Sequence, residues 1–541
     1  MLRKFYDLAK SARSLARFSV AIILMSFATC AMCAGNCTVV HHPPPSPADT
    51  AFLAADYAKA EGLYRADLAK SPADADLTAG LIHSLLSQMK VQTAADVLRA
   101  PGQRVAESPA MMTLRGEVEL KGGDPEKAVE TAVASVKLDP CNPRTLLLLS
   151  KLEDLNSQYA TARKMLMSAH RLDSEDPEIR LAWLKTLPVA QRIPEMEAYL
   201  AAPRGDSPEQ RGFLQADLGH LKAWASEPRK PCTMSSPATN LEVPFVAIQD
   251  VRAETIAYGL NVKVNDHTVL LAVDTSYNTR QPIDGFSGVE INRPVAQKWG
   301  LKPAFQNDVA GTGGQVARGG FVAIADRIVI GGLEFHDCAV QVMDGNFPNN
   351  ADGIIGMDLL SSFLVTFDYP GKKLVLSPLP PRPQQASSTD GLYNRYIAPE
   401  MKDYIPVFRS GTDVILPMKV SEKWTWLFVL DTAVGYTYLS PEGQFEFNMG
   451  HRDDKYEIRD ANGRVPTSYT GGHAKLAFGD VSWMESPIGS FDTSRFTDDA
   501  GAEISGLLGL KSLGNFTTHI DYRDGLVKLD FDPKRKTPFS F

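Results

Sequence analysis

The sequence predicts a multidomain protein in which an all-α helical repeat domain is followed by an all-β double domain. The 541 residues are too many for one ordinary hydrophobic core, so two or three domains are expected. Residues of the N-terminal half recur at an interval of 34, and motifs of the C-terminal half recur after 153 residues. With 44% apolar and 22% charged residues, the chain has the composition of a globular protein that can bury large cores.

The helical prediction covers residues 51–226, which are rich in Ala, Leu, Lys and Glu. Two residue types recur every 34 positions, prolines suited to open a helix and alanines suited to close helix approach: Pro109, Pro143, Pro177, Ala94, Ala128 and Ala162. The stretch 114–128 resembles the helix-turn-helix of tetratricopeptide repeats, and Leu138-Asp139-Pro140 is similar to the end of such a repeat. Stacked helix pairs of this kind present a concave groove. We expect these helices either to bind a substrate or protein partner or only to stabilise the C-terminal half.

The all-β prediction starts from two apolar runs that favour strands. Each run ends in an Asp-Thr pair, Asp274-Thr275 after residues 269–273 and Asp431-Thr432 after residues 426–430. One such aspartate would be read as a turn or cap residue, because Asp commonly bonds the backbone ahead of it. Two copies in the same context require a common explanation.

A second signature follows each Asp-Thr pair and shows that the half is duplicated. Two apolar residues lie between glycines in 353–356 and again in 506–509, and an Asp-Tyr pair follows at 368–369 and again at 521–522. Gly356 and Gly509 are 153 residues apart, as are Asp368 and Asp521. The duplication therefore has two lobes, which we place at 244–378 and 403–534.

These paired motifs resemble the aspartic peptidases of the retropepsin and pepsin type over roughly residues 244–534. The resemblance implies that Asp274 and Asp431 are the catalytic pair of an endopeptidase acting on polypeptides. It also implies that Thr275 and Thr432 brace the two loops. Gly356 and Gly509 would let the backbone pass close behind each aspartate.

The chemistry of such a pair needs no metal and no cofactor. Two carboxylates brought together cannot easily both ionise, so they share one proton and titrate as a coupled pair. One acts as general base on a water molecule, and the other acts as acid toward the scissile carbonyl.

Two features leave alternatives open. Ser276 and Ala433 stand where glycine is usual, which admits a catalytically inactive lobed module that binds peptides or serves as a scaffold. In the first lobe, Asp284 opens a second, degenerate aspartate loop over residues 284–291. We prefer Asp274 because an apolar strand leads straight into it and threonine follows.

Hairpins that could cover a cleft are expected after each Asp-Thr pair. In the first lobe, residues 311–314 are Gly-Thr-Gly-Gly and lack the Lys-Ser/Thr of a phosphate loop. In the second lobe, residues 460–464 supply an Asn-Gly turn in the corresponding place.

The N-terminus predicts export to the periplasm or outside the cell. Basic residues precede a short apolar run and then small residues, which is typical of a signal peptide over residues 1–35. An uncleaved anchor or a lipid-bearing cysteine at Cys30, Cys33 or Cys37 is an alternative, but we expect no stable membrane span in the mature form. The remaining cysteines, Cys141, Cys232 and Cys338, lie in different regions, so disulfides are permitted by export but not indicated.

The net charge of −8 and pI near 5.8 argue against nucleic-acid binding. Proline-rich and polar stretches complete the expected division of the chain: a spacer at 36–50, a linker at 227–243 and a linker at 379–402.

Overall fold

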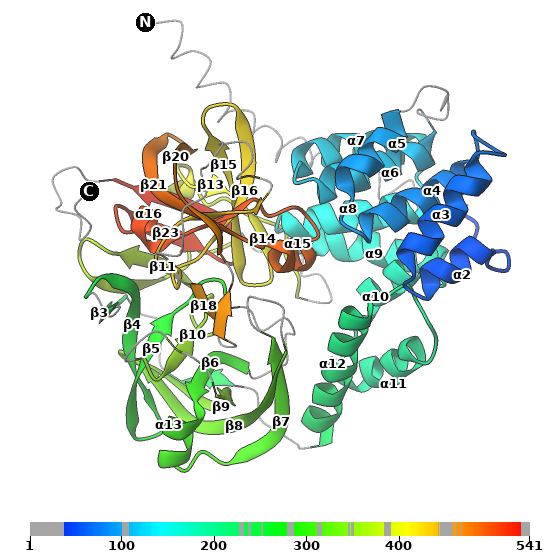
Figure 1. Ribbon diagram of the computed structural model, residues 1–541. Helices are drawn as coiled ribbons and strands as arrows, with labels where there is room; N and C mark the ends of the chain where they lie inside the picture. The colour runs from blue at the N-terminus through cyan, green and yellow to red at the C-terminus, as the bar shows by residue number, and fades with distance from the viewer. Residues whose placement is uncertain are drawn as a thin grey trace, which may run out of the picture. The chain divides into compact units, whose positions relative to one another are not determined.

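The computed structural model describes most of the chain from residue 37 onward. The described residues are 37–99, 108–226, 232–235, 240–249, 253–277, 286–310, 316–344, 347, 351–383, 391–441, 443, 458–460, 463–465 and 467–531. They form two compact units, one helical and one rich in strands (Figure 1). The helical unit also includes the described residues of two short segments from the C-terminal half, 391–394 and 501–503. The predicted fold class, helices followed by an all-β region, is confirmed.

Eleven helices are described in the helical unit. They are α2 (Pro47–Leu53), α3 (Tyr57–Leu68), α4 (Ala75–Leu86), α5 (Val91–Arg99), α6 (Pro109–Lys121), α7 (Pro125–Leu138), α8 (Pro143–Leu155), α9 (Tyr159–Leu172), α10 (Pro177–Leu184), α11 (Val189–Leu200) and α12 (Pro208–Ser226).

The 34-residue period places equivalent residues at equivalent points of successive helix pairs. The three prolines of this period open α6, α8 and α10, and each follows a capping side chain, Ser108, Asn142 or Asp176. Proline is tolerated there because the first helical N–H has no partner within the helix. The three alanines at the same interval lie in α5, α7 and α9 and are at most 4% exposed. A small side chain at each of these positions lets neighbouring helices pack closely.

The described residues of the predicted spacer are bonded to the helical unit. Cys37 forms a disulfide with Cys141. The Val40 N–H donates to the Leu172 carbonyl at 2.8 Å, and His42 pairs with Asp173 at 2.9 Å. Helix α2 begins at Pro47, inside the predicted spacer. Pairing with Cys141 also argues against Cys37 as a lipid-bearing cysteine, while the predicted signal peptide lies outside the described residues.

The β-rich unit contains twenty-four described strands and a few short helices. The strands of the first half are β1 (Thr233–Met234), β2 (Leu241–Pro244), β3 (Val246–Gln249), β4 (Thr255–Val264), β5 (His267–Val273), β6 (Phe286–Asn292), β7 (Pro303–Ala310), β8 (Val316–Ile330), β9 (Leu333–Met343), β10 (Gly353–Ile355), β11 (Phe363–Asp368) and β12 (Lys373–Pro378). The strands of the second half are β13 (Ile405–Pro406), β14 (Phe408–Ser410), β15 (Asp413–Val420), β16 (Trp424–Leu430), β17 (Tyr438–Leu439), β18 (Ile458–Asp460), β19 (Gly463–Val465), β20 (Thr467–Phe478), β21 (Val481–Phe491), β22 (Gly506–Leu508), β23 (Thr517–Asp521) and β24 (Leu526–Asp530). The helices are α13 (Arg293–Lys298), η1 (Pro399–Met401), α15 (Ser494–Ala500) and α16 (Leu510–Leu513).

Each lobe has its own sheet, and the two sheets repeat one arrangement around the Asp-Thr pair. In the first lobe β10 runs parallel to β5 and antiparallel to β6. In the second lobe β22 runs parallel to β16 and antiparallel to β17. The strand that carries the second signature therefore lies directly beside the strand that ends at the aspartate, in both lobes.

A third sheet joins the lobes, with strand order β13-β24-β23-β11-β12-β2. Strand β11 of the first lobe pairs antiparallel with β23 of the second, from Leu364 opposite Asp521 to Asp368 opposite Thr517. The two Asp-Tyr pairs thus stand where the strands at the junction end, and one hydrophobic core runs from the first lobe into the second. This shared sheet fixes the two lobes relative to each other (Figure 1).

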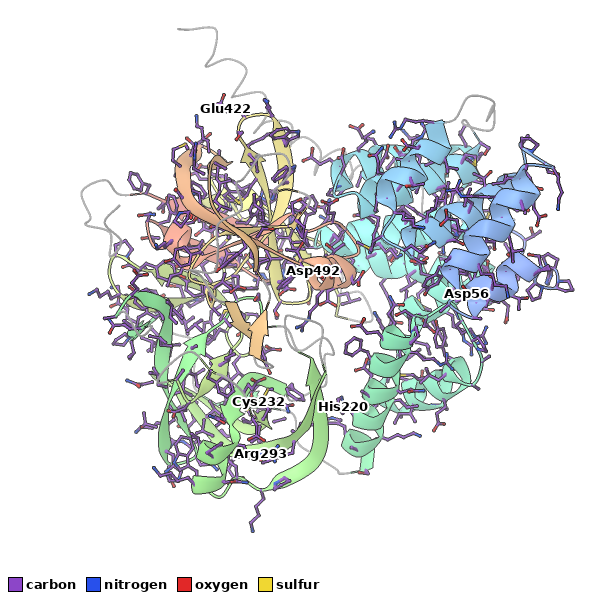
Figure 2. The ribbon with its side chains drawn as sticks, viewed as in Figure 1. Asp56, His220, Cys232, Arg293, Glu422 and Asp492 are labelled. Carbon is purple, nitrogen blue, oxygen red and sulfur yellow. A yellow bond between two sulfur atoms is a disulfide. The ribbon has the colours of Figure 1, made fainter. Side chains whose placement is uncertain are left out.

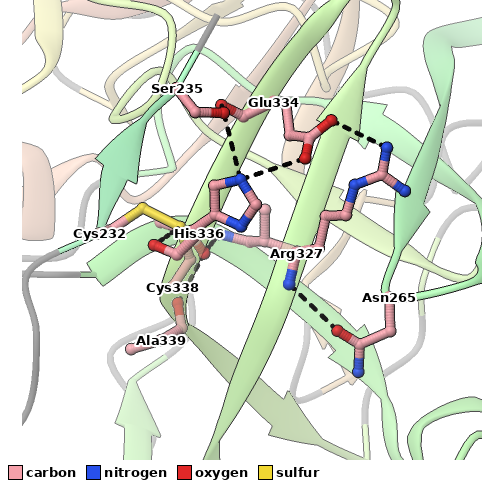
Figure 3. The surroundings of a disulfide bond; sticks show 10 residues. Cys232, Ser235, Asn265, Arg327, Glu334, His336, Cys338 and Ala339 are labelled. Atoms are coloured by element: carbon pink, nitrogen blue, oxygen red, sulfur yellow. Dashed lines mark hydrogen bonds and ion pairs between the residues drawn. A yellow bond between two sulfur atoms is a disulfide. The ribbon is translucent and has the colours of Figure 1, made fainter.

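A second disulfide ties the segment predicted to be a linker to the first lobe. Cys232 bonds Cys338 of β9, and β1 pairs with β9 beside it. Figure 3 shows the adjoining polar row, in which Glu334 pairs with Arg327 at 2.8 Å and with His336 at 3.1 Å. Neither disulfide is indicated by a local cysteine pattern, because the partners lie 104 and 106 residues apart and only the fold brings them together. Among the described helices, none has the length and apolarity needed to cross a membrane.

Candidate active site

The two predicted aspartates end equivalent strands and are held by equivalent backbone hydrogen bonds. Asp274 follows β5, and its N–H donates to the carbonyl of Ile355 at 3.0 Å. Asp431 follows β16, and its N–H donates to the carbonyl of Leu508 at 3.1 Å. In each lobe the strand of the second signature thus extends its pairing by one residue and fixes where the aspartate leaves the sheet.

The two threonines bond across the lobes in a symmetric pattern. The Thr275 hydroxyl donates to the Leu430 carbonyl at 2.7 Å, and the Thr432 hydroxyl donates to the Val273 carbonyl at 2.7 Å. Each hydroxyl also accepts the backbone N–H of the other threonine, at 3.1 and 3.2 Å. Both threonines are buried, at 0% and 3% exposure. These four hydrogen bonds lock the loop of one aspartate against the loop of the other.

The carboxylates are held by backbone N–H groups and joined by one side chain. Asp274 Oδ1 accepts the Ser276 N–H at 2.8 Å. Asp431 Oδ1 accepts the Ala433 N–H at 2.8 Å and the Val434 N–H at 3.1 Å. The Ser276 hydroxyl lies 3.0 Å from Asp274 Oδ1 and 2.9 Å from Asp431 Oδ2. The two carboxyl groups are therefore within two hydrogen bonds of each other.

Burial favours the protonated form of both carboxyl groups. Burial, followed by the charge of Asp274, raises the pKa of Asp431 to about 7. Burial also raises the pKa of Asp274, while hydrogen bonds from Ser276 and the positive charge of Arg495 act in the opposite direction. Because the two groups interact, they titrate as a pair rather than independently. The geometry and the direction of both pKa shifts are those expected of two carboxyl groups that share a proton.

The glycines of the second signature stand where no side chain would fit. A Cβ on Gly509 would lie 2.0 Å from the Tyr436 carbonyl oxygen, and one on Gly356 would lie 2.8 Å from the Tyr277 carbonyl oxygen. Backbone from the aspartate loop passes directly over each glycine, so a side chain at either position would collide with it.

A buried acid near the first aspartate, Glu290, was not among the residues predicted for the site. Glu290 of β6 is 1% exposed and accepts the Tyr277 hydroxyl at 3.0 Å. Burial raises the pKa of Glu290 to about 7, and the charge of Asp274 contributes to this shift. The sequence does mark this residue, because Glu290 is the one glutamate within the strand-like run 286–292.

Several predicted features fall partly or wholly outside the described residues. Asp284, the alternative first-lobe aspartate, is one of them. The glycine turn 311–314 is another, although β7 and β8 on either side of it form the expected antiparallel hairpin. In the second lobe β18 and β19 pair as a short hairpin across the predicted Asn-Gly turn.

Comparison with known proteins finds one family match, and it lies within the first lobe. Residues 260–359, which include Asp274 and Gly356, match the family model described as aspartyl protease. A retropepsin-like aspartic protease from Rickettsia conorii is 20% identical over 27% of this chain and 94% of its own, with a TM-score of 0.17. A thermophilic TPR protein from Thermus thermophilus is 15% identical over 32% of this chain and 95% of its own, with a TM-score of 0.26. A search of curated proteins returns no match.

Proposed function

We propose that this protein, whose residues 260–359 carry an aspartyl protease domain, is an aspartic endopeptidase that uses Asp274 and Asp431 to activate water. The observation that carries the proposal is the hydroxyl of Ser276, which lies within hydrogen-bond distance of both carboxyl groups. Two acids joined in this way, the half-buried Asp274 and the buried Asp431, form the constellation needed for acid and base catalysis without a covalent intermediate.

The reaction follows from the proton that the pair shares. Water attacks the carbonyl carbon of the scissile peptide while the ionised carboxylate accepts a proton from that water. The protonated carboxyl group donates its proton to the carbonyl oxygen, which gives a neutral tetrahedral intermediate. The intermediate then collapses: the nitrogen takes up a proton from one carboxyl group as the C–N bond breaks, and a hydroxyl of the intermediate gives its proton to the other carboxylate as the C=O bond re-forms. One proton enters the pair for each proton that leaves it, so the pair ends in its starting state.

The residues that replace glycine are compatible with this activity. The N–H groups of Ser276 and Ala433 both donate to the neighbouring carboxylate at 2.8 Å, as a glycine N–H would. The substitutions therefore leave the backbone hydrogen bonds to the aspartates in place. What Ala433 adds is a methyl group beside the second aspartate.

The substrate that we propose is an unstructured polypeptide outside the cytoplasm. The two disulfides indicate an oxidising, extracytoplasmic location. Export by a signal peptide would place the protein there, in the periplasm or the medium. The sequence predicts a mature start between about residues 29 and 38, and N-terminal sequencing should find it no later than Cys37, because the disulfide to Cys141 requires that residue.

We further propose that the helical repeats recruit the substrate or a partner. Polar or charged side chains recur at one position of successive repeats: His83, Glu117 and Lys151 are spaced by 34 residues on α4, α6 and α8. Arg144 links this row to α10, bonding Glu117 at 2.7 Å and Glu178 at 2.6 Å. A row of this kind offers polar groups of both signs along the repeat array, which suits an extended polypeptide.

The decisive experiment is cleavage of an unfolded polypeptide, such as a reduced and alkylated protein, at mildly acid pH. The purified chain should cleave it, and Asp431→Asn should lower the rate about 1,000-fold or more, because the acid and base roles both need the pair. Glu422→Gln, which removes a carboxylate from the exposed surface of the second lobe, is the matched control and should cleave normally (Figure 2). Ala433→Gly should preserve or raise the rate.

The contrary outcome defines the alternative function. If the parent chain binds the unfolded polypeptide without cleaving it, and Asp431→Asn binds equally well, the protein is a catalytically inactive peptide-binding module. In that case the Ala433 methyl group is the first feature to examine.

A further inference from the structure

The hydroxyl of Ser276 makes more hydrogen bonds than its own proton can supply. It lies 3.0 Å from Asp274 Oδ1 and 2.9 Å from Asp431 Oδ2. A serine hydroxyl has one O–H to donate and lone pairs to accept with. Two ionised carboxylates accept only, so at least one of these contacts needs a proton on an aspartate.

The backbone hydrogen bonds decide which aspartate carries that proton. On Asp274, the oxygen that contacts the serine hydroxyl is Oδ1, which already accepts the Ser276 N–H at 2.8 Å. On Asp431, both backbone N–H groups go to Oδ1, and the serine hydroxyl contacts the other oxygen, Oδ2. A protonated oxygen is a poor acceptor for an N–H, so Asp431 Oδ2 is the better place for the proton.

We propose that Ser276 is a positioning residue that places the shared proton on Asp431 and keeps Asp274 ionised as the general base. The order of donation is then Asp431 Oδ2–H to Ser276 Oγ, and Ser276 Oγ–H to Asp274 Oδ1. The nearby positive charge of Arg495 acts in the same direction, because it favours the ionised form of Asp274. Among the residues that the structure describes, Glu290, Tyr277, Tyr369 and Tyr522 also interact with one of the two aspartates, and these four side chains are acidic or phenolic.

The inference rests on the proposed peptidase function. It gives the serine that replaces glycine at position 276 a role in catalysis. Glycine at position 276 would keep the N–H but would leave the two carboxyl groups without this side-chain link. Serine therefore adds a contact that glycine cannot make.

The test compares Ser276→Ala and Ser276→Gly with the parent chain. Both variants remove a donor from ionised Asp274 and an acceptor from protonated Asp431. In a profile of kcat/KM against pH, the acid limb should move to higher pH and the alkaline limb to lower pH, each by about one pH unit. The pH range of activity therefore narrows. Ser361→Ala, whose hydroxyl donates to a backbone carbonyl elsewhere in the first lobe, should leave both limbs unchanged.

A merely structural role for Ser276 gives a different result, in which rates fall equally at every pH and the limbs stay in place. That result would overturn the proposal. Carbon-13 NMR titration of labelled aspartates separates this failure from failure of the proposed function, because it requires no turnover. If the parent chain proves inactive but Ser276→Ala still moves the titrations of both carboxyl groups, the assignment of Ser276 stands while the peptidase function falls. Unmoved titrations in both variants would refute the assignment whatever the activity.

Discussion

Replacing Asp431 by asparagine should change how the stability of the β-rich unit depends on pH. Asp431 is 3% exposed, and burial raises its pKa from 3.8 to about 7. The folded state therefore holds this proton more tightly than the unfolded state does. Its contribution to stability is fully present below about pH 4 and is lost as the pH rises toward 7. A shift of this size corresponds to about 4 kcal/mol across that window.

Asparagine has nearly the same shape and does not titrate. Its carbonyl oxygen can accept the N–H groups that Asp431 Oδ1 accepts, and its amide can donate to Ser276 Oγ. Relative to the parent, Asp431→Asn should therefore gain about 4 kcal/mol of unfolding free energy between pH 4 and pH 8.

Urea unfolding at several pH values, followed by tryptophan fluorescence, measures this difference. The signal reports mainly on the β-rich unit, which holds four of the six tryptophans, Trp299, Trp424, Trp426 and Trp483. Glu422→Gln, at an exposed ion pair, should follow the parent at every pH. An equal difference in unfolding free energy between Asp431→Asn and the parent at pH 4 and pH 8 would show that folding does not raise the pKa of Asp431.

Three further predictions concern stability. Thr275→Val should cost about 3 kcal/mol in urea unfolding, because it leaves the buried Leu430 carbonyl and Thr432 N–H without their partner; a loss below 1 kcal/mol would contradict the cross-lobe hydrogen bonds. Gly509→Ala should cost about 3 kcal/mol or more through collision with the Tyr436 carbonyl, whereas Gly219→Ala in α12, where a Cβ has nothing within 4 Å, should be neutral or stabilising. Replacing Cys37 and Cys141 by serine should lower the midpoint of thermal unfolding of the helical unit, and an unchanged midpoint would show that the disulfide does not restrain it.

Much of the fold could be predicted because it is encoded in periodic, local signals. Prolines that open helices and alanines that let helices approach are set by helix geometry, and both recur at the same interval along the chain. The Asp-Thr pairs could likewise be identified because each follows an apolar strand and precedes a matching glycine signature. The structure places these pairs on equivalent strands of two similar sheets.

The features that escaped prediction depend on contacts between distant segments. Ser276 was recognised only as a departure from glycine, since its hydroxyl meets Asp431 across 155 residues of sequence. The two disulfides likewise join cysteines more than 100 residues apart. Arg495 lies in α15, far along the chain from the aspartate whose pKa it lowers, and no local pattern marks it. These residues act through contacts that form only when the chain is folded, and no periodic pattern in the sequence marks them.

Carbon-13 NMR titration of the labelled aspartate carboxyl groups measures whether Asp274 and Asp431 share one proton. Signals are assigned by loss in Asp274→Asn and Asp431→Asn. At pH 5 to 6 we expect a protonated Asp431 beside an ionised Asp274, with the Asp431 carboxyl group losing its proton near pH 7. Finding both carboxyl groups ionised at pH 5, each titrating near 4 as an isolated aspartate does, would contradict this expectation.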